Sequence, residues 1–250
     1  MNRTYIILGA ASGIAKAVSR SLASRGHDLI LAGRSQEELN LLAKDLETRH
    51  QVQARILVFD ASCRAEVTGL LEASTRLNDA QLVDGVILAY GVMFPQPETE
   101  ANLDLLALTL EVNLVSSVLV LQAFANAFVT RGRGVIVGIS SVAGDRGRGS
   151  NYHYGCSKAG LSAFLDGLRH RLHDKGVHVC TVKPGFVATP MTDGLVNPNS
   201  PLCARPDQVA RDILRAIDRK TGRIYTLWVW RWIMMIIRSV PEFLFLRTKL

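Results

Sequence analysis

Short apolar runs alternate with longer amphipathic segments through the first 140 residues of the chain. The short runs have the length of β-strands, and those from residue 54 onward are rich in valine and isoleucine. We expect strands at 4–8, 28–32, 54–59, 85–89 and 134–139, separated by helices at 14–24, 35–49, 64–77 and 103–129. Because the runs are continuous, both faces of the sheet must be covered. The pattern predicts a doubly wound, Rossmann-type α/β fold built by right-handed crossovers.

The second half of the chain continues this pattern without a linker. We expect a helix at 152–175, a strand at 177–182, a Pro/Gly loop to about Pro206 and a further helix to Arg219. A length of 250 residues suits one large domain. Hydrophobic residues at 48% and charged residues at 20% exclude a disordered chain. The predicted organisation is a single domain, 1–222, followed by an amphipathic C-terminal segment, 223–250.

Charge and cysteine content narrow the environment and the partners. A net charge of +7 suits a phosphate cofactor, an acidic membrane or a nucleic acid, and its sign alone does not choose among them. The four cysteines, Cys63, Cys156, Cys180 and Cys203, form no CxxC pair, which favours a reducing compartment and no metal site. Gly9 interrupts the first apolar run, so no export signal is expected. These features indicate a cytoplasmic protein.

A glycine loop joins the first expected strand to the first helix. Gly9 permits a tight turn, Gly13 allows the backbone to approach a pyrophosphate, and Ala15 keeps the helix close to its strand. The GxxxGxA spacing differs from the common GxGxxG, and a ligand-free glycine-rich turn is the alternative interpretation. A second residue supports the nucleotide site: Arg34 ends the second strand, where a bound dinucleotide has its adenosine ribose. A guanidinium there matches a 2′-phosphate, so NADP(H) is favoured over NAD(H). The alternative, a solvated cation at a helix start, opposes the helix dipole.

A third feature carries acid–base chemistry. Tyr154 and Lys158 are four residues apart on one helix face, so the ammonium is expected to favour the phenolate. Lowering a phenol pKa from ~10 to neutrality takes about 4 kcal/mol, which the ammonium and an oxidised nicotinamide supply together. Ser141 stands just beyond the fifth strand. Ser140 lacks the closing glycine of a GxSxG elbow, so a hydrolase is not expected.

With these motifs in this order, the chain resembles the short-chain dehydrogenase/reductase family up to Arg219. The resemblance implies that Ser141 polarises a substrate carbonyl, Tyr154 exchanges the proton, and Asn113 supports a water relay. Lys158 is implied to hold the nicotinamide ribose and to tune Tyr154. The cofactor-binding positions implied by the resemblance are Gly9, Ser12, Gly13, Ile14, Arg34, Asp60, Ala61, Ala89, Gly91, Tyr154, Lys158, Pro184, Gly185, Val187 and Thr189.

Two positions depart from the family pattern. Ala89-Tyr90-Gly91 replaces the Asn-Ala-Gly that follows the fourth strand, which removes the hydrogen bonds of the asparagine side chain. Ala15 replaces the third glycine of the loop. The first departure motivates a non-enzymatic hypothesis, an NADP(H)-binding sensor protein.

The C-terminal segment is basic and rich in tryptophan. Trp228, Trp230 and Trp232 precede an apolar stretch that Pro241 ends, and five basic residues stand against one acidic residue in 223–250. Arg231 and Arg238 interrupt the stretch, so it does not fit a spanning helix of ~20 apolar residues. Contact of 227–246 with a membrane interface, or the mouth of a lipid-substrate site, fits better. The alternative is a terminal strand with a core or dimer helix.

The segment, together with the residues around Ser141 and Pro184, also resembles the decaprenylphosphoryl-2-keto-pentose reductase branch of the family. That resemblance implies NADPH-dependent reduction of a 2-keto-pentose carried on a polyprenyl phosphate. A soluble reductase of a small or fatty carbonyl is the alternative. We further expect a homo-oligomer formed through the helices at 103–129 and 152–175, and no nucleic-acid partner, because no basic and aromatic platform occurs before the last thirty residues.

Overall fold

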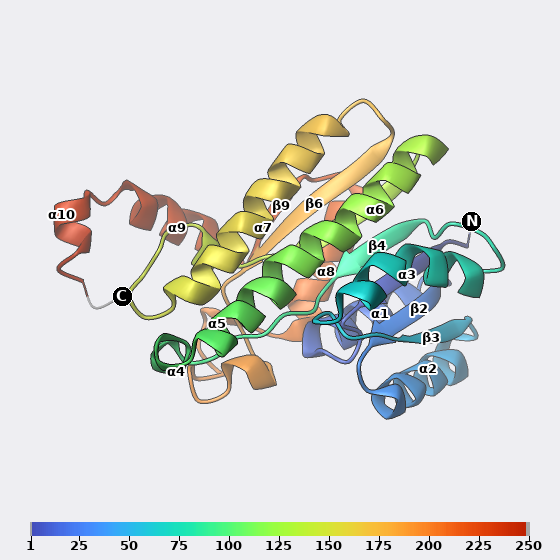
Figure 1. Ribbon diagram of the computed structural model, residues 1–250, viewed down its shortest axis with the longest axis horizontal. Helices are drawn as coiled ribbons and strands as arrows, with labels where there is room; N and C mark the ends of the chain where they lie inside the picture. Colours follow the sequence, from blue (N-terminus) through green and yellow to red (C-terminus); the bar gives the residue numbers. More distant parts are fainter. Residues whose placement is uncertain (1, 249–250) are drawn as a thin grey trace.

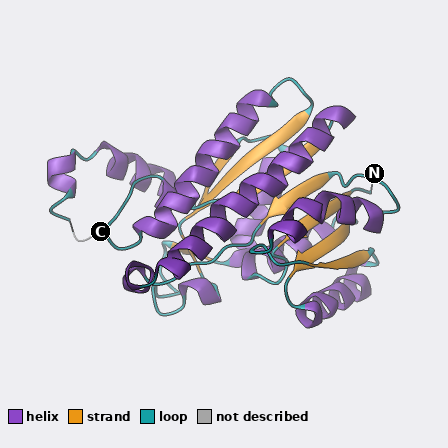
Figure 2. Ribbon diagram, in the orientation of Figure 1, coloured by secondary structure: helices purple, strands orange, loops and turns teal. Residues whose placement is uncertain are grey.

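The computed structural model describes residues 2–248 (Figure 1). Seven parallel strands form one sheet in the order β3-β2-β1-β4-β5-β6-β9, and helices cover both faces (Figure 2). The strands are β1 (Thr4–Leu8), β2 (Asp28–Gly33), β3 (Ala54–Val58), β4 (Gly85–Leu88), β5 (Gly134–Ile139), β6 (Val177–Pro184) and β9 (Arg223–Thr226). A separate pair joins β7 (Phe186–Val187) to β8 (Cys203–Ala204). The predicted doubly wound parallel sheet is confirmed.

The sheet separates two hydrophobic cores. Side chains alternate along β1, so Ile7 faces one core and Ile6 the other. The first core is closed by α1 (Gly13–Ala23), α2 (Gln36–His50) and α8 (Pro206–Asp218). The second is closed by α3 (Arg64–Leu77), α6 (Ser116–Arg131) and α7 (Tyr152–Arg171). Burial on both faces explains why the strands read as continuous apolar runs.

The long helix expected at 103–129 is divided. It consists of α5 (Leu103–Leu110), a π-helical turn (Glu111–Val115) and α6, and it is preceded by the short α4 (Gln96–Ala101), which the sequence analysis did not predict. The stretch is apolar on most of its sides, so its sequence carries no clear hydrophobic period in which the extra residue of a π turn could be recognised. The helix expected to reach 175 ends at Arg171, before Gly176 with φ of 70°.

By length and composition, the helical stretch Leu103–Arg131 is apolar enough to cross a bilayer. In this fold it lies over the sheet, where Leu121 and Phe124 are fully buried. Packing against the sheet therefore accounts for the apolar side chains on one side of this stretch, whereas others, such as Leu103, are exposed.

The C-terminal segment begins inside the sheet. Its first residues form β9, parallel to β6, so the expected boundary at 222 falls just before the last strand. Then follow α9 (Val229–Ser239), which ends before Pro241, and α10 (Glu242–Phe245). Trp230 and Met234 of α9 are buried against Val142. The alternative interpretation, a terminal strand with a core helix, therefore describes this part of the segment.

Candidate active site

The glycine loop lies between β1 and α1, at the carboxyl edge of the sheet. Gly9 has φ of 81°, and a Cβ there would lie 2.7 Å from the backbone nitrogen and Cβ of Tyr90. The Ser12 hydroxyl accepts a hydrogen bond from the Ala15 amide at 3.3 Å, which caps α1. A Cβ on Gly13 would lie 3.1 Å from a methyl group of Thr189. The first turn of α1 carries no acid, so the positive end of the helix dipole has no negative side chain from its own turn.

Arg34 and Asp60 lie at the neighbouring strand ends. Arg34 follows β2 and is exposed, and Asp60 and the buried Ala61 follow β3. Hydrogen bonds from the Ser62 amide and hydroxyl lower the pKa of Asp60, and the charge of Arg34 lowers it further. The structure therefore brings both predicted adenosine-side residues to one place, with the guanidinium facing solvent. The glycine loop, the N-terminus of α1 and the strand ends that carry Arg34 and Asp60 together fit the phosphates of a dinucleotide.

The expected reacting groups gather beyond β5. Ser141 caps a short turn (Val142–Gly144), where its hydroxyl accepts from the Ala143 amide at 3.1 Å. Tyr154 and Lys158 lie on α7, and the Lys158 ammonium is 5.7 Å from the centre of the Tyr154 ring. The ammonium donates a hydrogen bond to the Ile139 carbonyl at 3.2 Å.

The π turn places Asn113 in this cluster. Its side chain accepts from the Val92 amide and donates to the Val92 carbonyl, both at 2.8 Å, and it donates to the Ser157 hydroxyl at 3.2 Å. A Cβ on Gly91 would lie 3.0 Å from Asn113 Oδ1 and 3.4 Å from Lys158 Nζ. The absence of a side chain at Gly91 thus leaves room for both the asparagine and the lysine beside it. Single π turns inside helices are frequent at functional sites.

The protonation state of Tyr154 differs from the expectation. Burial raises its pKa to about 12, with the Ser141 side chain acting in the opposite direction. Burial also lowers the pKa of Lys158 to about 8. The prediction that Lys158 shifts the phenol toward neutrality is therefore wrong for the chain itself, because desolvation dominates and the ammonium is directed at the Ile139 carbonyl. The phenol carries its proton throughout the neutral range.

Tyr90, the departure from the family pattern, has a structural role. Its hydroxyl lies 3.0 Å from the Ser116 hydroxyl, and its ring packs edge-on against Phe59 at 5.8 Å. Burial raises its pKa to about 12. These contacts hold the turn between Ala89 and Gly91 without the missing asparagine side chain. The Ala89 carbonyl accepts from the Ser12 hydroxyl at 3.4 Å, which ties this turn to the glycine loop.

The loop after β6 contacts the C-terminal segment. A Cβ on Gly185 would lie 2.0 Å from the Trp230 indole, whose Nε1 donates to the Leu202 carbonyl at 3.2 Å. Val187, in β7, is buried. Pro184 and Thr189 bracket this loop, so four predicted cofactor positions share a segment that α9 supports. This support was not predicted, because a glycine and a tryptophan far apart in the sequence give no signal that they are in contact.

Polar contacts link the turn that follows Ser141 to the C-terminal segment. Lys183 forms an ion pair with Asp145, and the Tyr225 hydroxyl donates to the same carboxylate at 2.9 Å. Arg146 donates to the Ile237 and Val240 carbonyls at the end of α9. Sequence reasoning did not identify these contacts, because they join residues about 40 to 95 positions apart. Among residues 2–248, no cluster of histidine, cysteine and acidic side chains fits a metal ion.

A doubly wound sheet with a glycine loop at its carboxyl edge and a Ser, Tyr and Lys cluster beside it defines a dinucleotide-dependent oxidoreductase. Residues 3–199 match the profile described as short chain dehydrogenase. The chain belongs to the short-chain dehydrogenase/reductase family.

Curated relatives support this assignment, two of them matched over almost their whole length. An uncharacterized oxidoreductase of Mycobacterium tuberculosis is 33% identical over 97% of this chain and 95% of that protein. An uncharacterized oxidoreductase of Streptomyces coelicolor is 32% identical over 98% of this chain and 95% of that protein. Human inactive hydroxysteroid dehydrogenase-like protein 1 is 31% identical over 76% of this chain and 57% of that protein.

Solved structures share the fold. A short-chain dehydrogenase from Sphingobium yanoikuyae in complex with NADPH has a TM-score of 0.79 at 24% identity, covering 96% of this chain and 97% of that one. A short-chain dehydrogenase/reductase from Mycobacterium ulcerans has a TM-score of 0.79 at 22% identity, covering 90% and 88%. The protein is thus an oxidoreductase of a family that binds NAD(P)H.

Proposed function

We propose that the protein reduces a ketone to a secondary alcohol with NADPH. The observation that carries this proposal is the cluster of Ser141, Tyr154, Lys158 and Asn113, in which Tyr154 has a pKa of about 12. A protonated phenol suits the reductive direction, because reduction of a carbonyl consumes one proton together with one hydride.

Each group has a distinct part in the proposed reaction. Bound NADPH supplies the hydride. The Ser141 hydroxyl donates a hydrogen bond to the carbonyl oxygen, and Tyr154 donates its proton to that oxygen as negative charge develops. The partly protonated Lys158 stabilises the phenolate left behind. Asn113 holds the Val92 backbone beside this cluster. The ketone gains two hydrogens, and solvent restores the phenolic proton.

The preference for NADP(H) is proposed from Arg34. Its guanidinium is exposed and lies near Asp60. In NAD-selective sites an acidic residue at the end of the second strand holds the ribose 2′-hydroxyl, and this chain has Arg34 at that place. The cofactor is proposed to lie along Gly9, Ser12, Gly13 and Ile14, with its adenosine end at Arg34.

The favoured substrate class is a lipid-linked ketone, with a 2-keto-pentose on a polyprenyl phosphate as the specific candidate. Exposed apolar side chains on the C-terminal segment support this substrate class, because they offer a surface to a lipid. Trp228 is 72% exposed and Ile236 is 63% exposed, and the segment packs against the loop at Gly185. We propose that 227–246 contacts a membrane interface. A homo-oligomer through α5, α6 and α7 is proposed from the exposed Leu103 and Tyr152.

A product analysis tests the proposal. The purified protein is incubated with NADPH deuterated at the transferable position and, in parallel, with lipid extracts and with small or fatty ketones. We expect deuterium on the carbinol carbon of a polyprenyl-linked sugar. Labelling of small or fatty alcohols alone would refute the lipid-linked substrate, and labelling of none would refute the reductase in favour of an NADP(H)-binding sensor.

A further inference from the structure

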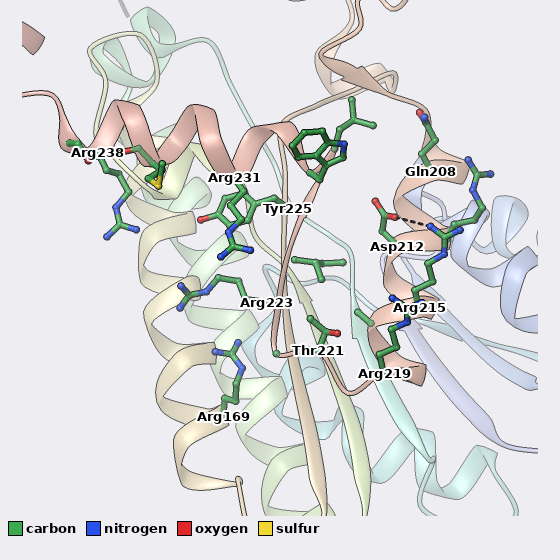
Figure 3. Close-up of a pocket in the computed structure, with 18 residues that line it drawn as sticks. Arg169, Gln208, Asp212, Arg215, Arg219, Thr221, Arg223, Tyr225, Arg231 and Arg238 are labelled. Carbon is green, nitrogen blue, oxygen red and sulfur yellow. Dashed lines mark hydrogen bonds and ion pairs between the residues drawn. The ribbon is translucent and has the colours of Figure 1, made fainter.

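A broad basic groove runs along the free edge of the sheet, beside β9 and between α8 and α9 (Figure 3). Its volume is about 1100 Å³. Seven arginines line it against one acidic residue, Asp212, whereas the whole chain carries a net charge of +7. We call it the arginine groove, formed by Arg169, Arg211, Arg215, Arg219, Arg223, Arg231 and Arg238. The residues that line the groove therefore carry a strong local excess of positive charge.

The helical spacing gathers these charges. Arg211 and Arg215 lie in α8 and Arg219 caps its C-terminus; at intervals of four residues, they form a row along one side of the helix and its end. Arg231 and Arg238 are seven residues apart on α9 and extend into the groove from its opposite side (Figure 3). Both helices thus direct guanidinium groups into the same space.

Most of this charge has no acidic partner. Arg169 and Arg223 share Asp166, and Arg215 lies 3.9 Å from Asp212. Within residues 2–248, no ion pair involves Arg211, Arg219, Arg231 or Arg238. Like charges held together in this way repel one another, and an anion entering the groove would relieve that repulsion.

The side of α9 next to the groove is apolar and exposed. Trp230 and Met234 point into the protein, and Arg231 lines the groove. Trp232, 49% exposed, and Ile236 lie on the remaining side of the helix. The α10 helix and the residue after it add the exposed side chains of Phe243, Leu244 and Leu246. A cationic surface bordered by exposed tryptophan and aliphatic side chains is the pattern of a helix lying in a membrane interface.

We propose that the arginine groove, together with the exposed apolar side of α9 and α10, docks on an anionic phospholipid membrane. The arginines bind headgroup phosphates, and the apolar side chains enter the boundary of the acyl region. This inference rests on the membrane contact proposed for 227–246, and it adds residues of α8 as the part that selects negatively charged lipid. A second copy set groove against groove across a two-fold axis would present the same positive charge, so the groove does not favour a symmetric dimer. A nucleic acid offers nothing to the exposed aliphatic side chains.

Vesicle sedimentation tests the docking without substrate or cofactor, so its outcome is independent of the reductase activity. The full chain is mixed with vesicles of phosphatidylcholine alone, or of phosphatidylcholine with phosphatidylglycerol. The test variant is the double substitution Arg211→Gln and Arg219→Gln. The matched control is Arg49→Gln with Arg76→Gln, two exposed helical arginines outside the groove.

We expect the wild type and the control to bind the anionic vesicles, with binding that weakens as salt is added. The groove variant should bind about 30-fold more weakly, since each arginine near a charged surface contributes roughly fivefold. Retention of binding by the groove variant, an equal loss in the control, or equal binding to neutral vesicles would overturn the proposal. Tighter binding to double-stranded DNA than to anionic vesicles would also overturn it.

Discussion

Replacement of Lys158 by methionine should abolish turnover and yet stabilise the fold. The side chain is 4% exposed, and burial lowers its pKa from 10.5 to about 8. At pH 7 this depression corresponds to about 3 kcal/mol of native-state destabilisation. Methionine removes the buried charge at similar volume, and it forfeits the hydrogen bond to the Ile139 carbonyl, worth about 1 kcal/mol. The free energy of unfolding should rise by about 2 kcal/mol.

The pH dependence gives the sign of this effect a second test. Between pH 8 and 10.5 the unfolded chain keeps a proton on Lys158 that the native protein has lost, so wild-type stability rises with pH in this window. The advantage of Lys158→Met should therefore shrink to below about 1 kcal/mol near pH 9.5. Urea unfolding at pH 7 and pH 9.5 measures the difference in the free energy of unfolding between the variant and wild type. The control is Lys44→Met, at an exposed position, whose free energy of unfolding should differ little from that of wild type at either pH. A Lys158→Met variant that is less stable than wild type at pH 7, with no change across this window, would refute the reasoning.

Two further substitutions probe the site from its edges. Gly185→Ala should destabilise the protein by about 1 to 3 kcal/mol, because its Cβ would lie 2.0 Å from the rigid Trp230 ring. Gly69→Ala, in an open helical position, should raise stability by up to about 1 kcal/mol in the same thermal or urea unfolding assay; equal effects at both glycines would contradict the contact. Arg34→Gln should weaken NADPH binding about 10- to 100-fold while leaving NADH binding nearly unchanged, measured by fluorescence titration; a parallel loss for both cofactors would show that Arg34 does not select the 2′-phosphate.

The sheet could be predicted in detail because each of its inner strands is buried on both faces. The runs at 4–8 and 134–139 coincide with β1 and β5. The last strand, β9, could not be identified in the same way. Its four residues run from the exposed Arg223 to the fully buried Thr226, with only one aliphatic side chain, and one edge of this strand has no neighbour in the sheet. An edge strand of this kind lacks the continuous apolar run on which the prediction depended.

The site was predictable where spacing along one element sets the geometry, and where the resemblance to a family supplies the residue, as for Ser141 and Asn113. Tyr154 and Lys158 are neighbours because a helix makes them so, and Gly9 and Gly13 belong to one turn. The protonation of Tyr154 in the chain without cofactor depends on burial by distant segments, which raises its pKa and which the spacing of Tyr154 and Lys158 does not encode. The support of the Gly185 loop by Trp230 likewise depends on tertiary packing that no local pattern encodes.

The central claim is that Tyr154 is the proton donor of a hydride-transfer reaction. Its most direct test is a single-turnover measurement of NADPH oxidation, with an accepted ketone, in wild type and in Tyr154→Phe. The variant keeps the ring and its packing and loses only the hydroxyl. We expect the variant still to bind NADPH and the rate of oxidation at saturating cofactor to fall by about 100- to 10,000-fold. A Tyr154→Phe variant that oxidises NADPH at the wild-type rate would contradict the account.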